Sequence, residues 1–318
     1  MTDHPGGLTR DHVVWAYRLL LDRDPENEQV IGPKLAGSRD TRELRHHLIT
    51  SAEFREKNPD FAQTNDRTLV IKEIATPAGT VRLFIDLSDH VIGLNILRGH
   101  YERDEVTFVL RRLAPGDVAI DVGAHIGFFT MQMAAAVGPS GRVYAFEPHD
   151  LNAELLERSV AENRFSDRVL FRRAAVGASS GTATLTFPTE TLNSGGAYLL
   201  RSGTSPLAGN VERQVPVVAL DDLGIDRRVA VVKMDVEGAE PLVVQGGRRL
   251  LERDRPIVLS ELHPTQLDRA AGVTPGEFLR QMQGLRYEAH HVTGDSVGPK
   301  IERAPENAMV SVVFLPIG

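Results

Sequence analysis

The sequence contains no cysteine among its 318 residues. This absence excludes disulfide bonds, thiolate nucleophiles and zinc sites built from cysteine. Aromatic residues are also few, at 6% with a single tryptophan, and no apolar run approaches the ~20 residues that a membrane span needs. The first residues lack a basic segment followed by an apolar one, so we expect no signal peptide and a cytoplasmic location.

Positive charge is in deficit as well. The chain carries 36 Lys and Arg against 43 Asp and Glu, a net charge of −7 at pH 7. An acidic balance argues against a nucleic-acid-binding surface. The length allows one large core, or one core with a small appendage, and leaves open whether the protein forms a homo-oligomer.

The apolar pattern divides the chain into two predicted parts. Residues 1–62 predict a small helical module. Its expected helices are His12–Leu21, Thr41–Thr50 and a short third one from Ser51. Residues 63–318 predict an α/β domain, in which 63–115 form a β-hairpin with a helical cover and 116–318 form the catalytic core.

Strands and helices are expected to alternate along this core. The predicted strands include Val118–Ile120, Arg142–Phe146, Arg168–Val176, Gly181–Phe187, Val211–Leu220, Val229–Met234, Ile257–Leu262, Tyr287–Val292 and Ala308–Leu315. The predicted helices include Phe128–Val137, Asn152–Asn163, Gly238–Leu251 and Pro275–Gln283. The loop Thr189–Asn210 is long for a compact domain. We interpret it as a lid over the acceptor site, and a plain disordered loop is the alternative.

The stretch VAIDVGAHIG, from Val118 to Gly127, predicts a nucleoside site. A buried strand ends at Asp121, and a turn with glycines at Gly123 and Gly127 leads into a helix. The next strand ends at Glu147, where a ribose diol would find a carboxylate acceptor. Two neighbouring strands with these ends predict a crevice that binds a nucleoside.

The chemistry of the turn favours S-adenosylmethionine over a dinucleotide. A dinucleotide turn needs a middle glycine to admit a pyrophosphate, and His125 stands in its place. Asp121 would repel a pyrophosphate and suits the ammonium and sulfonium of S-adenosylmethionine. An NAD(P)-dependent oxidoreductase remains the rival enzyme class.

A second set of acids follows two later strands. Asp235 is expected to project over the carboxyl edge of the sheet, where open α/β sheets bind ligands. Asp235, Glu261 and His263 are therefore the candidate bases for activating a hydroxyl; position favours Asp235, and intrinsic pKa favours His263. Together with Glu237 they could instead hold Mg²⁺ or Ca²⁺, but no tight ligand spacing supports a metal site.

Tyr101 and Glu102 precede a helix that should cover the ligand. They could contact the methionine end of the nucleoside or the acceptor. Equally, Tyr101 could be a packing residue and Glu102 a surface acid.

Four blocks of sequence resemble the FkbM family of S-adenosylmethionine-dependent methyltransferases. They read DVGAHIGFFT, VYAFEPHDLNAELLERSVAEN, VKMDVEGAEPLVVQGG and RPIVLSELH, and GHYERDE and the Asn193–Gly196 loop join them. The resemblance covers roughly Gly93 to His263. It implies a class I (Rossmann-like) methyltransferase fold, whose seven-stranded sheet has the order 3-2-1-4-5-7-6 with strand 7 antiparallel. It also implies O-methylation of a sugar hydroxyl or a polyketide-type natural product.

The same resemblance assigns roles to single residues. It implies that the methionine portion is held by Asp121, Gly123, Ala124 and Gly127. Glu147 would hold the ribose hydroxyls, Ala175 would lie beside the adenine, and Asp235 would sit where donor and acceptor meet. The family often has Asn where this chain has His125, a position expected to contact the methionine part.

Near the N-terminus, AYRLLLDRDPE and SAEF resemble DUF4214, a small helical module often found in bacterial proteins of surface-polysaccharide pathways. Because such modules occur in proteins of polysaccharide pathways, the resemblance favours a glycan acceptor by association. It also raises a third hypothesis, a non-catalytic scaffold whose helical module contacts pathway proteins.

Ligand binding separates the two enzyme classes. S-adenosylhomocysteine should raise the melting temperature of the purified protein, because a ligand that binds only the folded state stabilises it. NAD should leave the melting temperature unchanged. A shift with NAD alone would identify the oxidoreductase, and no shift with either would favour the scaffold.

Overall fold

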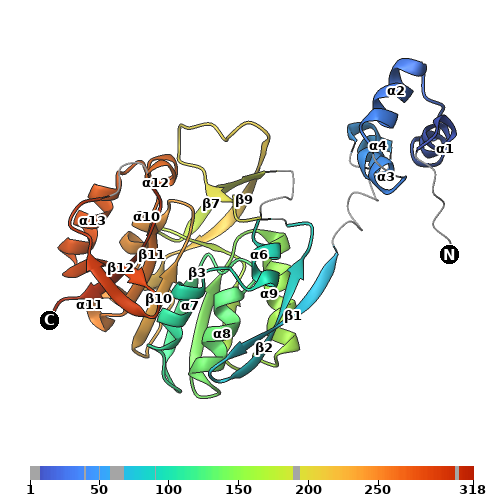
Figure 1. Cartoon of the computed structure of the whole chain (residues 1–318). Coiled ribbons are helices and arrows are strands. Elements are labelled where there is room, and N and C mark those ends of the chain that lie inside the picture. The colour runs from blue at the N-terminus through green and yellow to red at the C-terminus, as the bar shows by residue number, and fades with distance from the viewer. Residues whose placement is uncertain are drawn as a thin grey trace. The chain divides into compact units, whose positions relative to one another are not determined.

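The computed structural model describes residues 8–38, 41–49, 51–57, 68–89, 91–188, 194–304 and 308–318. The chain divides into two compact units, Met1–Thr68 and Leu69–Gly318 (Figure 1). No helix within the described ranges has both the length and the apolar character that crossing a membrane requires.

The N-terminal unit is a small helical bundle. Its described helices are α1 (Arg10–Leu21), α2 (Glu28–Ala36), α3 (Thr41–Ile49) and α4 (Ala52–Lys57). Helix α2 was not predicted, because Gly32 and Pro33 lie inside it and both are poor helix formers. The core of the unit consists of Val13, Tyr17, Leu21, Ile31, Leu44, Leu48 and Phe54.

The second unit is built on a mainly parallel sheet. Across the described ranges this sheet has eight strands, in the order β13-β12-β14-β11-β10-β3-β4-β5. The strands are β3 (Val118–Val122), β4 (Arg142–Phe146), β5 (Val169–Arg172), β10 (Val229–Met234), β11 (Ile257–Leu262), β12 (Tyr287–Thr293), β13 (Ser296–Lys300) and β14 (Val310–Pro316). Without β13 the order along the chain is 3-2-1-4-5-7-6, and β14 runs antiparallel to both neighbours. The described sheet thus has one strand more than the expected seven. The extra strand, β13, was not predicted because it contains Gly298 and Pro299, and both residue types are disfavoured in strands.

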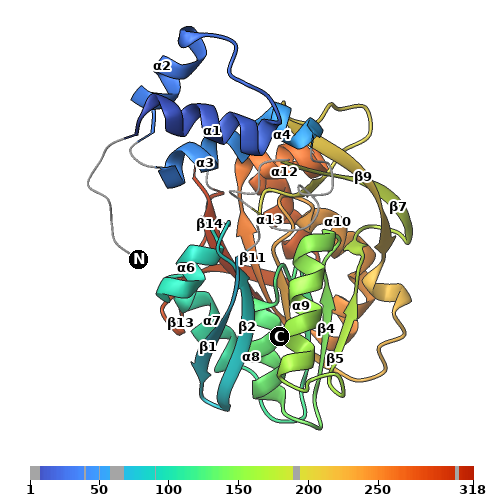
Figure 2. The same ribbon diagram turned by 90° about the vertical axis from the view of Figure 1, so that its right-hand side faces the viewer.

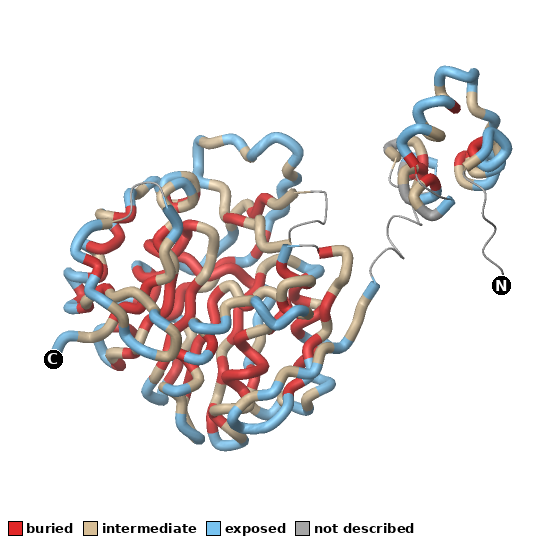
Figure 3. The backbone as a smooth tube through the Cα atoms, viewed as in Figure 1, coloured by how far each residue is buried: buried red, intermediate tan, exposed pale blue. Residues whose placement is uncertain are grey.

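Helices cover both faces of this sheet (Figure 2). One face packs against α7 (Arg103–Leu110), α8 (Phe128–Val137) and α9 (Asp150–Glu162), and the hairpin β1 (Leu69–Thr76) and β2 (Gly79–Asp86) lies outside α8 and α9. The other face packs against α10 (Glu240–Gly246), α11 (Arg248–Asp254), α12 (Pro264–Ala271) and α13 (Pro275–Gly284). Successive residues of β3 serve opposite faces, with Ala119 in one core and Val118 and Ile120 in the other. Both faces are therefore buried in the described part of the chain (Figure 3), and the strand ends are left to contact a ligand.

Two predicted elements are broken in the structure. The expected strand Arg168–Val176 ends at Arg172, and β6 (Ala175–Val176) joins a second sheet instead. In the described residues this sheet has the order β6-β9-β7-β8, with β9 (Asn210–Val218), β7 (Gly181–Pro188) and β8 (Tyr198–Leu199). The expected helix Gly238–Leu251 splits into α10 and α11. At the break, Gly246 lies so close to β6 that a Cβ would be 2.0 Å from the carbonyl oxygen of Gly177.

Gly246 therefore holds a helix end against the small sheet. We expect Gly246→Ala to lower the free energy of unfolding by about 1–3 kcal/mol, because the methyl group overpacks a backbone contact. Gly284→Ala, also at a helix end, is the matched control, since no described atom lies within 4 Å of its Cβ position. Urea denaturation measures both, and equal effects would show that the contact at Gly246 does not limit packing.

Candidate functional site

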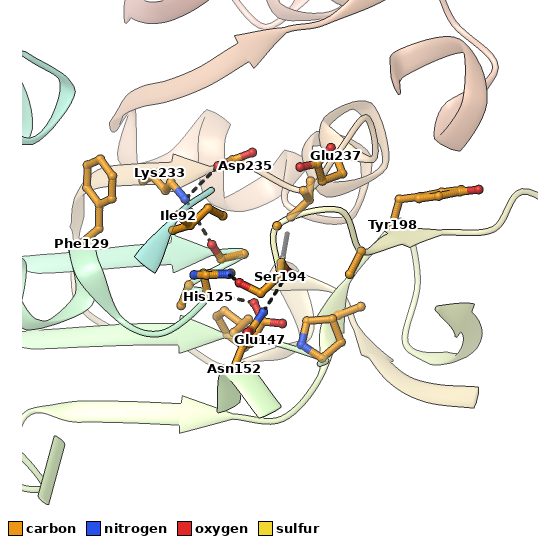
Figure 4. Close-up of a pocket in the computed structure, with 18 of the residues that line it drawn as sticks. Ile92, His125, Phe129, Glu147, Asn152, Ser194, Tyr198, Lys233, Asp235 and Glu237 are labelled. Atoms are coloured by element: carbon orange, nitrogen blue, oxygen red, sulfur yellow. Dashed lines mark hydrogen bonds and ion pairs between the residues drawn. The ribbon is translucent and has the colours of Figure 1, made fainter. Parts of the chain in front are cut away.

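One cavity lies at the carboxyl ends of β3, β4, β10 and β11. It has a volume of about 360 Å³ and opens between the turns that follow these strands (Figure 4). The predicted site residues that line it are Tyr101, Glu102, Gly123, Ala124, His125, Glu147, Ala175, Asp235 and Glu261. The nucleoside set and the acid set, which the sequence placed separately, therefore share one space.

Three predicted residues are not among the described residues that line this cavity. Asp121 is fully buried; Thr130 donates a hydrogen bond to its Oδ2 at 2.5 Å, and its Oδ1 has no hydrogen-bond partner in the described structure. Gly127 is the N-cap residue of α8, with φ at 92°, and lies near Leu156. His263 is half-buried and immediately precedes α12.

The turn after β3 fixes the carboxylate of Glu147. The amide of His125 donates to Oε2 at 2.9 Å, and the amide of His149 donates to Oε1 at 2.8 Å. Burial raises the pKa of Glu147 to about 7, and these two hydrogen bonds oppose the rise. Each oxygen keeps a second lone pair, so the carboxylate can still accept hydrogen bonds from a diol.

Ser194 ties the loop before β8 to this turn. Its hydroxyl lies 2.6 Å from Nε2 of His125 (Figure 4). The same hydroxyl donates to the carboxylate of Asp89. Since the hydroxyl proton goes to Asp89, Nε2 must be the donor toward Ser194. Burial lowers the pKa of His125 to about 4, so its imidazole is neutral at pH 7. Residues 189–193 of the predicted lid are outside the described structure. They include Asn193, the first residue of the loop Asn193–Gly196 that resembles the FkbM family.

Lys233 is the site residue that sequence reasoning missed. Its ammonium lies 3.6 Å from Oδ2 of Asp235 (Figure 4). It also donates to the carbonyl of Gly123 at 3.1 Å and lies 3.9 Å from Oδ1 of Asp121. Burial favours the neutral amine, but the carboxylates of Asp235 and Asp121 outweigh it and raise the pKa of Lys233. The signal in the sequence was a single lysine inside the otherwise apolar strand VAVVKM.

Carboxyl groups crowd the other end of the cavity. Oxygens of Glu102, Asp235 and Glu261 lie within 4.8 Å of one another, a grouping that could hold a divalent cation. This group differs from the predicted set, since it contains neither His263 nor Glu237, which instead accepts a hydrogen bond from Gln266.

The pKa values of Glu261 and Glu102 are raised where these acids lie close together. Burial, followed by the charges of Asp235 and Glu102, raises the pKa of Glu261 to about 9. Burial also raises the pKa of Glu102 to about 7, with the charge of Lys233 opposing it. Glu261 is therefore protonated at neutral pH and can donate a hydrogen bond. Tyr101 lines the cavity and also packs edge-on against Phe128, with ring centroids 5.2 Å apart.

Glu261 should make folding stability depend on pH. Its folded pKa of about 9 lies above the ordinary value of 4.5, so the folded state binds a proton that the unfolded state has released. Stability from this group is present below about pH 4.5 and is lost as the pH rises to about 9. Glu261→Gln should flatten the fall in the free energy of unfolding over this range, as urea denaturation at several pH values would measure. The exposed Glu302→Gln is the control, and parallel curves for wild type and Glu261→Gln would contradict the assignment.

Comparison with known proteins identifies the domain around this cavity. The family described as "Methyltransferase FkbM domain" matches residues 121–289. The curated "31-O-demethyl-FK506 methyltransferase FkbM" of Streptomyces tacrolimicus is 32% identical over 42% of this chain and 60% of its own length.

Two solved structures were also found to be similar to this chain. Methyltransferase FkbM from Methylobacillus flagellatus KT has 16% identity and a TM-score of 0.40, over 95% of this chain and 58% of that one. A SAM-dependent O-methyltransferase from Thermotoga maritima has 15% identity and a TM-score of 0.37, over 78% of each chain. The chain thus spans about 60% of the length of the curated relative. Because the family match covers more than half of the 318 residues, from the end of β3 into β12, the chain belongs to the methyltransferase FkbM domain family.

Proposed function

We propose that the protein is an S-adenosylmethionine-dependent O-methyltransferase that acts on a hydroxyl of a sugar, a glycan or a secondary metabolite. The observation that carries this proposal is the shared cavity. It joins the glycine turn and Glu147 at one end to Asp235 at the other. S-adenosylmethionine supplies an electrophilic methyl group on a positively charged sulfur, and a hydroxyl acceptor needs to be held in line with it.

The residues at the nucleoside end fit this cofactor. Glu147 presents two oriented carboxylate oxygens for the ribose hydroxyls. Ala174 and Ala175 form a wall with small side chains, where a flat purine has room. Asp121 is fully buried and is not among the described residues that line the cavity, and its Oδ1 lies 3.9 Å from the ammonium of Lys233. A pyrophosphate in the cavity would be repelled by the carboxylate of Glu147, which disfavours the NAD(P) alternative.

At the acceptor end, Asp235 is the residue we assign to orient or deprotonate the hydroxyl. Its side chain is 27% exposed and lines the cavity, while Lys233 pairs with its Oδ2. Glu261 carries a proton at neutral pH and serves as a hydrogen-bond donor, because its pKa is raised to about 9. His263 is not among the described residues that line the cavity, which supports Asp235 over His263 as the base. A base in this position contributes about 10²–10⁴-fold to the rate.

The class of acceptor rests on two kinds of similarity. The name of the Streptomyces relative describes methylation at an oxygen of a demethylated FK506, which supports a hydroxyl acceptor here. The resemblance of the N-terminal unit to DUF4214 favours a glycan. That unit is also proposed to contact a protein, and α1 carries the exposed apolar side chains of Trp15 and Leu19 one helical turn apart.

Radiolabelled methyl transfer tests the proposal. The protein is incubated with labelled S-adenosylmethionine and a panel of sugar nucleotides, glycolipids and macrolides, and label in the acceptor is counted. With an acceptor found, Asp235→Asn should lower kcat about 10²–10⁴-fold while S-adenosylhomocysteine still binds in calorimetry, because the charge is lost but the nucleoside end is intact. Asp268→Asn, in the exposed part of α12, is the matched control. Undiminished turnover in Asp235→Asn would remove its assigned role, and absence of cofactor binding to wild type would overturn the function.

A further inference from the structure

The acidic end of the cavity poses an electrostatic problem. Glu102, Asp235 and Glu261 come from three separate parts of the chain, and their oxygens gather within 4.8 Å. Like charges this close destabilise one another unless a cation or protons compensate them. In proteins, carboxylates grouped in this way commonly hold a divalent metal ion.

The described structure places a cation of its own beside this group. The ammonium of Lys233 lies 3.6 Å from Asp235 and 3.9 Å from Asp121. The side chain is only 7% exposed, so water screens these interactions weakly. Its charge is therefore felt strongly by the neighbouring carboxyls.

Lys233 is also held firmly in place. It comes from β10, which pairs with β3 and β11 in the middle of the sheet. Its ammonium donates to the carbonyl of Gly123 and lies 5.2 Å from the centre of the Phe129 ring, a favourable position for a cation. An ammonium has three hydrogen-bond donors, and Gly123, Asp235 and Asp121 lie around this one.

We propose that Lys233 is a positioning residue, a tethered cation that takes the place of a divalent metal ion at the acceptor end and holds the carboxylate of Asp235. This inference rests on the proposed function in naming that end of the cavity. A second cation among Glu102, Asp235 and Glu261 would lie beside the ammonium and be repelled by it. The wild-type protein therefore excludes Mg²⁺ and Mn²⁺ from this cluster.

Removing the ammonium should convert the cluster into a metal site. We expect Lys233→Met to bind Mn²⁺ at least about tenfold more tightly than wild type, because one adjacent positive charge is gone. Lys233→Arg keeps the charge and should exclude Mn²⁺ as wild type does. Lys300→Met, which removes an exposed lysine of β13, is the matched control and should not gain a site. Electron paramagnetic resonance of free Mn²⁺ measures binding without acceptor or cofactor.

Because Asp121 is a buried partner of Lys233, a second variant is needed as well. Lys233→Met leaves Asp121 uncompensated and can fail to fold. The double variant Lys233→Met with Asp121→Asn removes the uncompensated buried charge and keeps the three clustered carboxyl groups. We expect it to gain the same Mn²⁺ binding. Equal Mn²⁺ affinity in wild type, Lys233→Arg and the double variant would overturn the proposal.

Calorimetry with S-adenosylhomocysteine on the same samples separates this inference from the proposed function. If wild type does not bind S-adenosylhomocysteine but the Mn²⁺ pattern appears, the proposed function fails and Lys233 keeps its role as the tethered cation. If S-adenosylhomocysteine binds but no variant gains Mn²⁺ binding, the tethered cation is wrong and the proposed function stands.

Discussion

The close approach of β3 and β10 at their carboxyl ends is the constraint on which the site depends. A Cβ on Gly123 would lie 1.9 Å from the carbonyl oxygen of Asp235, so only glycine allows the backbone segments after β3 and β10 to come this close. Its φ of 74° turns the backbone away at once, which glycine adopts without strain. The turn that begins there carries His125 to Glu147, and the strand opposite carries Lys233 under the turn. The nucleoside end and the acceptor end of the cavity thus lie on either side of the contact between Gly123 and Asp235.

Electrostatics then gives the two ends different properties. At the nucleoside end, backbone amides hold the carboxylate of Glu147. At the acceptor end, the ammonium of Lys233 pairs with Asp235, while burial and repulsion keep a proton on Glu261. One acid is therefore paired with a cation and its neighbour is neutral, although the two lie within 4.8 Å. Environments that separate the behaviour of neighbouring acids are typical of sites that move protons.

The cavity also needs walls that the main sheet does not supply. The chain leaves that sheet after Arg172, and β6 pairs with β9 in the small second sheet. This departure brings Ala174 and Ala175 to the cavity and places β8 beside it. Ser194 then connects the loop before β8 to His125 and to Asp89. The carboxylate of Asp89 also accepts hydrogen bonds from the amides of Val91 and Ile92, just before α6 (Gly93–Arg98). Segments far apart in the sequence are in this way joined over the nucleoside end.

Elements with local signals could be predicted from the amino-acid pattern before the structure was known. The apolar run of β3, the glycine turn and the acids at strand ends are contiguous patterns, and the carboxyl edge of a parallel sheet collects them by a general rule. Tertiary structure alone decided the break after Arg172, the split at Gly246 and the extra strand β13, because each depends on a contact between distant segments. It also decided that Lys233 keeps its charge although it is buried: in the sequence it is one polar residue in an apolar strand, and only folding surrounds it with carboxylates.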